Sequence, residues 1–275
     1  MKYTIKSVVE IPYGEVLRVL VEYVERFVKE SRARGVVLGL SGGVDSSVLL
    51  ALLVKALSPS SVTALIMPDS RATPESDVED AVELAKNLGV NHYLVYIDQV
   101  VDSYRVAPFV EVLEDLPTGN LRARIRMNLL YYYANKYNML VAGSGDRSEL
   151  LIGYFTKYGD GAADFFPLGC LYKTQVRELG KFLGLPSEIV NKPSAPRLWR
   201  GHTALGELGY SYEEIDLALY TLFDLGMSVE EAVSSTGLPV ELFEKILGMH
   251  RRSKHKRASL QVPSLPWVRN PLREI

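Results

Sequence analysis

Short apolar runs alternate with longer amphipathic stretches along the first half of the chain. The apolar runs are typical of strands buried in a parallel sheet, and they occupy residues 36–40, 61–67, 92–97 and 139–145. Apolar positions repeated at helical spacing predict helices at residues 14–31, 45–57, 74–88, 120–137 and about 147–152. This alternation of strand and helix predicts an α/β fold, a doubly wound parallel sheet with helices on both faces.

The pattern changes in the last third of the chain. Two stretches rich in glycine, proline and polar residues, 153–171 and 191–210, flank a predicted helix at 173–184. Loops of this length inside a compact domain are usually functional or disordered. Three short helices are predicted next, at 211–223, 228–235 and 239–250, before a basic tail. We therefore expect a single domain over residues 1–275, with a small C-terminal helical appendage and flexible loops near 153–171 and 191–210.

Composition and charge exclude several classes of protein. The 275 residues carry a formal net charge of −2, so no overall charge attracts nucleic acid or an anionic membrane. The single cysteine, Cys170, excludes an internal disulfide framework and a cysteine-rich zinc site. No apolar segment typical of a secretory signal is apparent, and the longest apolar run, 48–54, is far shorter than the ~20 residues that span a bilayer. We expect a cytoplasmic protein with no nucleic-acid or membrane partner.

Residues 41–47 carry the strongest local motif, Ser-Gly-Gly-Val-Asp-Ser-Ser, between a predicted strand and a predicted helix. Two glycines let a backbone fold closely around an anion, and the free N–H groups that begin a helix favour negative charge. Asp45 would repel a phosphate unless a divalent cation bridges the two, and Mg²⁺ prefers such oxygen ligands. A Gly-Gly turn before a capped helix is the simpler alternative. The Walker A and dinucleotide-binding patterns are both missing.

The Ser-Gly-Gly-x-Asp-Ser pattern resembles the pyrophosphate-binding motif of the N-type ATP pyrophosphatases, which cleave ATP between its α and β phosphates to adenylate an oxygen. Further segments resemble the NAD synthetases of that superfamily, in order, over about residues 15–257. These segments are GNLRARIRM (119–127), SELLIGYFTKYGDGAAD (148–164), LYKTQVREL (171–179), ELG (207–209) and HKR (255–257). The run from Phe155 to Asp164 is the most specific of them.

The resemblance implies an adenine nucleotide alpha hydrolase-like fold and an ATP-dependent ligase that forms an amide bond. A carboxylate resists attack by an amine until AMP is attached to it as a leaving group. The implied reaction converts deamido-NAD to NAD by way of a nicotinate adenylate, with Mg²⁺ as cofactor and release of AMP and diphosphate. Glutamine-using members carry an extra nitrilase-like domain, for which this chain has no room, so we expect ammonia as the nitrogen donor. Members of the family are usually homodimers with substrate sites at the interface.

The resemblance also implies roles for individual residues. It assigns Asp45 and Glu149 to the metal, and Lys173 and Asp160 to the reacting centre. It assigns these residues to ATP: Ser41, Gly42, Gly43, Val44, Asp45, Ser46, Ser47, Ser144, Lys173 and Ser194. It assigns these residues to deamido-NAD: Arg124, Lys157, Asp164, Glu207, His255 and Lys256.

Each of these side chains has a plainer interpretation. Lys173 at the start of a helix could be exposed, and Glu149 alone would more often be a surface carboxylate. Arg122, Arg124 and Arg126 alternate along a predicted helix, so they cannot all face one way. His255 lies in a run of basic residues, which is usually a solvated tail.

The chain departs from its relatives at two places. Ile66 stands where some relatives have an arginine, so contact with adenine there would differ. His202, Ala204 and Leu205 replace polar and acidic residues in a loop that we expect to close over substrate.

Three other functions remain possible from the sequence alone. A tRNA thiolase or lysidine-type enzyme shares the phosphate loop but needs a basic surface, which this chain lacks. A GMP synthetase would need a C-terminal dimerisation domain and a different substrate loop. Residues 227–249 could form a DNA-binding helix-turn-helix, although Glu241 and Glu244 on its second helix would repel phosphate.

Overall fold

The computed structural model describes residues 3–110 and 114–258. Four strands, β1 (Val36–Gly39), β2 (Val62–Ile66), β3 (Asn91–Leu94) and β4 (Leu140–Ala142), form one sheet. The order of the strands is β3-β2-β1-β4, and every neighbouring pair is parallel. In register, Val36 of β1 stands beside Val62 of β2 and Leu140 of β4. The predicted parallel α/β sheet is therefore confirmed.

Helices cover both faces of the sheet because successive strand residues point to opposite sides. Val36 and Leu38 pack with α2 (Tyr13–Glu30), α3 (Val44–Ala56), α4 (Glu75–Asn87) and α8 (Lys173–Phe182). Val37 and Val141 pack on the other face with α5 (Asp98–Ser103) and α6 (Asp115–Tyr137). Helix α3 is apolar all round and buried from Ser46 to Leu53, as expected of a helix enclosed by protein.

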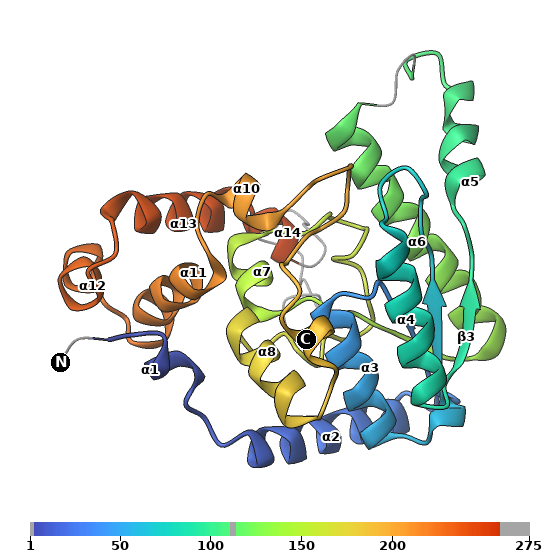
Figure 1. Cartoon of the computed structure of the whole chain (residues 1–275), viewed down its shortest axis with the longest axis horizontal. Helices are drawn as coiled ribbons and strands as arrows, with labels where there is room; N and C mark the ends of the chain where they lie inside the picture. The colour runs from blue at the N-terminus through green and yellow to red at the C-terminus, as the bar shows by residue number, and fades with distance from the viewer. Residues whose placement is uncertain (1–2, 111–113, 259–275) are drawn as a thin grey trace, which may run out of the picture.

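A second apolar core lies at the end of the molecule away from β3 (Figure 1). There α7 (Arg147–Ile152), α10 (Ala204–Leu208), α11 (Tyr212–Leu219), α12 (Val229–Thr236) and α13 (Val240–Arg252) pack with α1 (Lys6–Val9). A π-helical turn, Tyr220–Asp224, continues α11. Capping boxes fix the starts of α11 and α12 through Ser211 and Ser228.

Some predicted boundaries were wrong, and several short elements were missed. Strands predicted at 92–97 and 139–145 are shorter, and the helix predicted from residue 120 begins at Asp115. Pro117 is accommodated there because it lies in the first turn of α6. The missed elements are too short to show a period: α1, α5, α9 (Ser187–Val190), α10, α14 (Lys254–Arg257) and the 3-10 turns Pro59–Ser61 and Tyr104–Val106. Within the described ranges, no helix is both long and apolar enough to cross a membrane.

Asp216 connects the two apolar cores. Its carboxylate accepts hydrogen bonds from the hydroxyl of Ser148 (2.5 Å) and the backbone N–H of Thr174 (2.8 Å), at the starts of α7 and α8. The Asp216 side chain is fully buried. Burial raises its pKa from 3.8 to about 7, against the lowering effect of the two hydrogen bonds.

We predict that Asp216 lowers stability as pH rises from about 4 to about 7. In that window the folded protein keeps a proton on Asp216 that the unfolded chain has lost, so the free energy of unfolding falls with pH. The effect amounts to at most about 4 kcal/mol. Denaturant unfolding of the wild type and of Asp216→Asn checks this, since the variant cannot titrate. The free energy of unfolding of the wild type minus that of Asp216→Asn should decline as pH rises from about 4 to about 7 and level off above that range. A difference that does not change with pH would contradict the raised pKa of Asp216.

Candidate functional site

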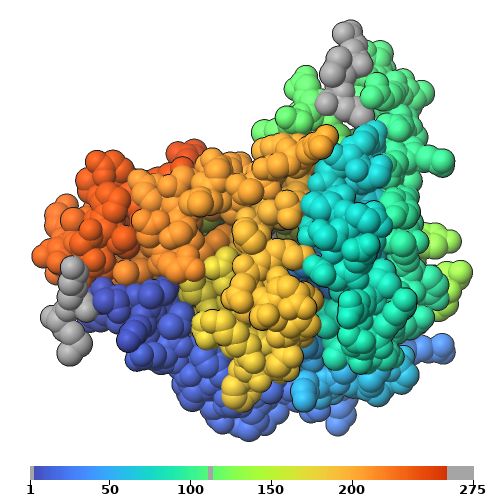
Figure 2. All heavy atoms as spheres, viewed as in Figure 1, coloured from blue at the N-terminus to red at the C-terminus, as the bar shows by residue number. Residues whose placement is uncertain are grey.

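A cavity of about 520 Å³ opens at the carboxyl ends of the strands, where ligands bind in sheets of this kind. The loops after β1, β2 and β4 line it, together with residues 192–198, whereas the loop after β3 contributes no described lining residue. Residues 191–210 run across this face between α4 and the C-terminal helices (Figure 2). The segment is not entirely loop, because α10 lies within it.

Side-chain hydroxyls close the phosphate loop, where the N–H of Gly43 donates to the hydroxyl of Ser41 at 3.3 Å. The hydroxyl of Ser46 donates to the carbonyl of Gly43 (3.1 Å) and accepts from the N–H of Ser41 (3.2 Å). Gly43 is the N-cap residue of α3, and no side chain caps that helix. The first amides of α3 are therefore available to an anion. Ser41, Gly43, Val44 and Asp45 line the cavity, while Gly42, Ser46 and Ser47 lie buried behind them.

Gly42 allows the loop to pass against α4. Its φ is +75°, and a Cβ at this position would lie 2.1 Å from the carbonyl oxygen of Asp77. A Cβ at Gly43, whose φ is −87°, would meet nothing closer than the Ser41 hydroxyl at 3.4 Å. The first glycine is therefore required by the fold, and the second leaves space in front of the free amides.

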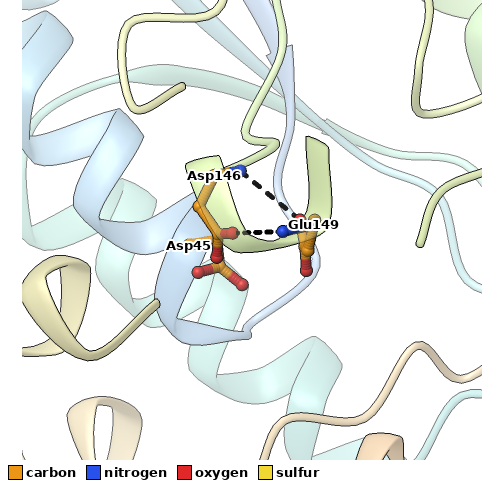
Figure 3. Close-up of side chains that lie close together, drawn as sticks. All are labelled: Asp45, Asp146 and Glu149. Carbon is orange, nitrogen blue, oxygen red and sulfur yellow. Dashed lines mark hydrogen bonds between the residues drawn. The ribbon is translucent and has the colours of Figure 1, made fainter. Parts of the chain in front are cut away.

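One ammonium and three carboxylates gather beside this loop. The Nζ atom of Lys173 lies 2.6 Å from Asp45, 2.8 Å from Asp146 and 2.8 Å from Glu149. Figure 3 shows the three carboxylates converging from the starts of α3 and α7, with Asp146 and Glu149 joined by the two bonds of a capping box. Lys173 is therefore not an exposed lysine and Glu149 is not an ordinary surface carboxylate, because their side chains are only 1% and 22% exposed.

The electrostatics of this cluster are set by its excess of negative charge. Burial raises the pKa of Asp146 and raises that of Glu149 well above its usual range, because Lys173 offsets only part of the burial and of the repulsion between carboxylates. Burial disfavours the charged form of Lys173, but the three carboxylates outweigh it and hold its pKa well above the usual range.

The cluster suits a hard divalent cation. Oxygen atoms of Asp45, Asp146 and Glu149 lie within 4.8 Å of one another. Oδ1 of Asp45 is buried and has no hydrogen-bond donor among the described residues, so it is free to accept a metal. An all-oxygen donor set beside a phosphate-binding loop fits Mg²⁺.

Asp160 lies farther along the cavity, on the turn after Thr156. One of its oxygens accepts the backbone N–H of Thr156 at 2.9 Å, and the Thr156 hydroxyl donates to Asn120. Its carboxylate is open to the cavity but surrounded by protein, and this burial raises its pKa. Lys256 also lines the cavity, and its ammonium donates to the carbonyls of Gly153 and Phe155.

The structure divides the residues that the resemblance assigns to deamido-NAD. Glu207 and Lys256 line the main cavity, as do Ser144 and Ser194 of the ATP set. Four others lie outside its lining: Arg124, Lys157, Asp164 and His255. Arg124 is exposed and donates to the carbonyl of Lys157 (3.3 Å). Asp164 accepts from the backbone of Val141 and from the hydroxyl of Tyr131.

The basic run near His255 is not a solvated tail in its described part. It forms α14, where Arg257 donates to the carbonyls of Leu150 and Leu151. His255 itself is exposed. The predicted basic tail continues into residues 259–275, which lie outside the described residues.

Two basic residues at the site were given no role from the sequence. Lys192 donates to the carbonyl of Gly42 (2.9 Å) and pairs with Asp77 (2.9 Å), which joins the 191–198 segment to the phosphate loop. Arg122 is buried, pairs with Asp69 and donates to the carbonyl of Leu198. Helical spacing could have indicated that Arg122 and Arg126, four residues apart, share the face that Arg124 does not.

The departure at His202 has a structural consequence. Its ring stacks on Trp199, with 3.6 Å between ring centroids, and its Nε2 atom lies 2.7 Å from a carboxylate oxygen of Glu207. The hydroxyl of Tyr154 donates to the same carboxylate at 2.6 Å. The carboxylate of Glu207 is therefore oriented by the hydroxyl of Tyr154 and the imidazole of His202.

Comparison with known proteins agrees with this geometry. The family model described as NAD synthase matches residues 16–260. The chain belongs to the NAD synthase family. A relative from Staphylothermus marinus, named NH(3)-dependent NAD(+) synthetase, is 54% identical over 275 residues and covers 100% of both chains. One of the same name from Hyperthermus butylicus is 56% identical over 263 residues, which are 96% of this chain and 95% of that protein.

Solved structures of similar proteins share the fold. An NMN synthetase from Francisella tularensis superposes with a TM-score of 0.82 at 36% identity, covering 93% of this chain and 100% of its own. An NH3-dependent NAD synthetase from Campylobacter jejuni superposes with a TM-score of 0.77 at 29% identity, covering 92% and 100%.

The two glycines of the phosphate loop should respond differently to alanine. Gly42→Ala should lower the free energy of unfolding by about 2 kcal/mol or more, because it combines a positive φ with a backbone overlap. Gly43→Ala should leave unfolding nearly unchanged and weaken nucleotide binding, since its methyl group would fill the space in front of the α3 amides. Thermal unfolding and equilibrium binding of ATP check both. Equal ATP affinity in Gly43→Ala and the wild type would show that the anion binds elsewhere.

Proposed function

We propose that this protein is an ammonia-dependent NAD⁺ synthetase, a ligase that uses ATP to convert deamido-NAD into NAD. The observation that carries the proposal is the meeting of three features at one end of one cavity: the uncapped start of α3, the carboxylates of Asp45 and Glu149, and the ammonium of Lys173. A phosphate-binding helix start, a metal site and an ammonium group side by side are what adenylation by ATP requires. Membership of the NAD synthase family supports the choice of acceptor.

The phosphate end of ATP would lie against the first amides of α3. The hydroxyl of Ser41 and the first backbone N–H groups of α3, beginning with that of Val44, would donate to the two terminal phosphates, which leave together as diphosphate. Lys173, held among the three carboxylates, offers a point charge to the departing group. Asp45 and Glu149 would hold Mg²⁺, which supplies neutralisation of the charge that builds on the phosphates.

The acid to be activated would enter from the side of Asp160. The nicotinate carboxylate of deamido-NAD attacks the α-phosphate of ATP. The bond between the α-phosphate and diphosphate breaks, and a nicotinate adenylate forms. Ammonia then attacks the acyl carbon and AMP leaves with the electrons of the broken bond. Asp160, whose pKa is raised by burial, is suited to accept the proton that the nitrogen loses. Neutral ammonia is required because ammonium has no lone pair.

We further infer that the protein acts as a homodimer. Most of the large exposed hydrophobic side chains in the described part of the chain lie between Tyr93 and Tyr137, with Val106 90%, Phe109 86% and Tyr132 71% exposed. Helix α5 and the adjoining end of α6 project beyond the sheet (Figure 1). An exposed apolar surface of this kind is typical of a protein interface. Arg124 is an exposed side chain of α6, so a second copy on this surface would bring the outlying acceptor residues into reach of a shared site.

A second acceptor has one observation in its favour. The Francisella tularensis structure is named an NMN synthetase, and an enzyme that makes NMN by amidation would use nicotinate mononucleotide. Two relatives named NH(3)-dependent NAD(+) synthetase are 54% and 56% identical to this chain over the aligned residues, whereas the NMN synthetase is 36% identical and the Campylobacter jejuni NAD synthetase 29%. We therefore propose deamido-NAD as the preferred acceptor.

The reaction should require ATP, Mg²⁺, ammonium and deamido-NAD together. AMP and diphosphate should appear in equal amounts with NAD, and nicotinate mononucleotide should be amidated more slowly. Asp45→Asn should lower turnover at least about 100-fold, because it weakens the metal site. Product analysis by chromatography checks this. Release of ADP and orthophosphate, faster turnover of the mononucleotide, or full activity with glutamine in place of ammonium would each contradict part of the proposal.

The dimer should depend on the exposed apolar surface formed by residues between Tyr93 and Tyr137. A protein carrying both Phe109→Asp and Tyr132→Asp should sediment as a monomer, because the charges would be buried without partners. Val19→Asp provides the control, since Val19 is 49% exposed on α2, away from that surface. Analytical ultracentrifugation measures all three proteins. A wild-type monomer, or a dimer that survives both substitutions, would refute the inferred interface.

A further inference from the structure

Lys173 is shared by three carboxylates that do not occupy equivalent positions. Asp45 and Glu149 line the cavity, and their side chains are 23% and 22% exposed. Asp146 does not line the cavity, and its side chain is 0% exposed. The ammonium thus bridges two carboxylates that a ligand can reach and one that lies in the protein interior.

The two carboxylate oxygens of Asp146 make different contacts. Oδ1 accepts the backbone N–H of Glu149 at 2.8 Å as the N-cap of α7. Oδ2 accepts no hydrogen bond of good geometry within the described residues, and it faces Lys173 Nζ at 2.8 Å. Capping a helix needs one acceptor oxygen and no charge, because serine or asparagine does it equally well. The negative charge of Asp146 therefore needs a separate explanation.

Charge balance supplies that explanation. When all four groups are ionised, three carboxylates and one ammonium carry two surplus negative charges, which one divalent cation balances. If Asp45 and Glu149 bind such a cation, Lys173 loses two of its three partners while it remains almost fully buried. An ammonium left unpaired beside a divalent cation would be strongly unfavourable.

We propose that Asp146 is a positioning residue, a buried counter-ion that keeps Lys173 paired when Asp45 and Glu149 bind the metal. The ion pair of Asp146 and Lys173 has no net charge. The two negative charges of Asp45 and Glu149 then balance the two positive charges of the cation. Asp146 acts through Lys173 and is not itself a ligand of the metal. The inference rests on the proposed metal and ATP site, and it adds to that site a residue whose charge decides how readily the metal binds.

The substitution Asp146→Asn tests the role of the charge. Asparagine has the same shape and keeps the N-cap bond to Glu149, so the fold should persist and near-wild-type thermal unfolding should confirm it. Binding of Mn²⁺, used as a paramagnetic substitute for Mg²⁺, is measured by electron paramagnetic resonance on the full chain without nucleotide. We expect Asp146→Asn to weaken Mn²⁺ binding about tenfold. The control variant Glu178→Gln removes a partly exposed carboxylate of α8 that pairs with Lys181, and it should bind Mn²⁺ like the wild type.

A double-mutant cycle with Lys173→Met separates the counter-ion from a third metal ligand. Without the ammonium, Asp45 and Glu149 have no internal competitor, so Lys173→Met alone should bind Mn²⁺ more tightly than the wild type. In that background Asp146→Asn should change Mn²⁺ affinity less than about threefold, because its counter-ion role has gone. If Lys173→Met does not remain folded, Lys173→Gln replaces it in the cycle.

Three results would overturn the proposal. An equal loss of affinity in both backgrounds would mean that Asp146 contacts the metal directly. No loss in either background would mean that Asp146 only caps α7. A wild type that binds no Mn²⁺ would leave the counter-ion without a purpose. Since no acceptor or ammonia is present in these measurements, an error in the proposed reaction would not alter them.

Discussion

A single ammonium group shared by three carboxylates connects the parts of this protein that carry its chemistry. Asp45 lies in the first turn of α3, Asp146 and Glu149 lie at the start of α7, and Lys173 begins α8. The four side chains thus join the first turns of three helices that are far apart in the sequence. Buried charges of this kind are compensated only by one another. The orientation of each helix start is therefore tied to that of the other two.

The sequence was sufficient for features that rest on local patterns. Apolar runs predicted the parallel sheet, and the assignment of Asp45 and Glu149 to one metal by the resemblance implied that they lie close together, as they do. The resemblance to NAD synthetases identified the family, which the comparisons bear out. Which of the assigned side chains contact ATP or deamido-NAD stays a prediction.

Contacts between distant segments could not be predicted in the same way. Asp146 has no sequence signal beyond that of a helix cap, and only the fold brings its second oxygen to Lys173. Lys192 reaches the carbonyl of Gly42 across 150 positions. Short helices such as α10 and α14 contain too few residues for a period to be recognised. Their formation depends on tertiary packing, which no local pattern records.

Helix α3 has a consequence for ligand selection. It is enclosed by the sheet, α2 and α8, and it is buried without interruption from Ser46 to Leu53. An element packed on all sides cannot shift without disturbing the whole core. The hollow in front of its first amides can therefore neither contract around a smaller anion nor widen for a larger one. The size of anion that fits in front of α3 is therefore fixed once the chain has folded. Any adjustment to the rest of the nucleotide must come from the 191–198 segment.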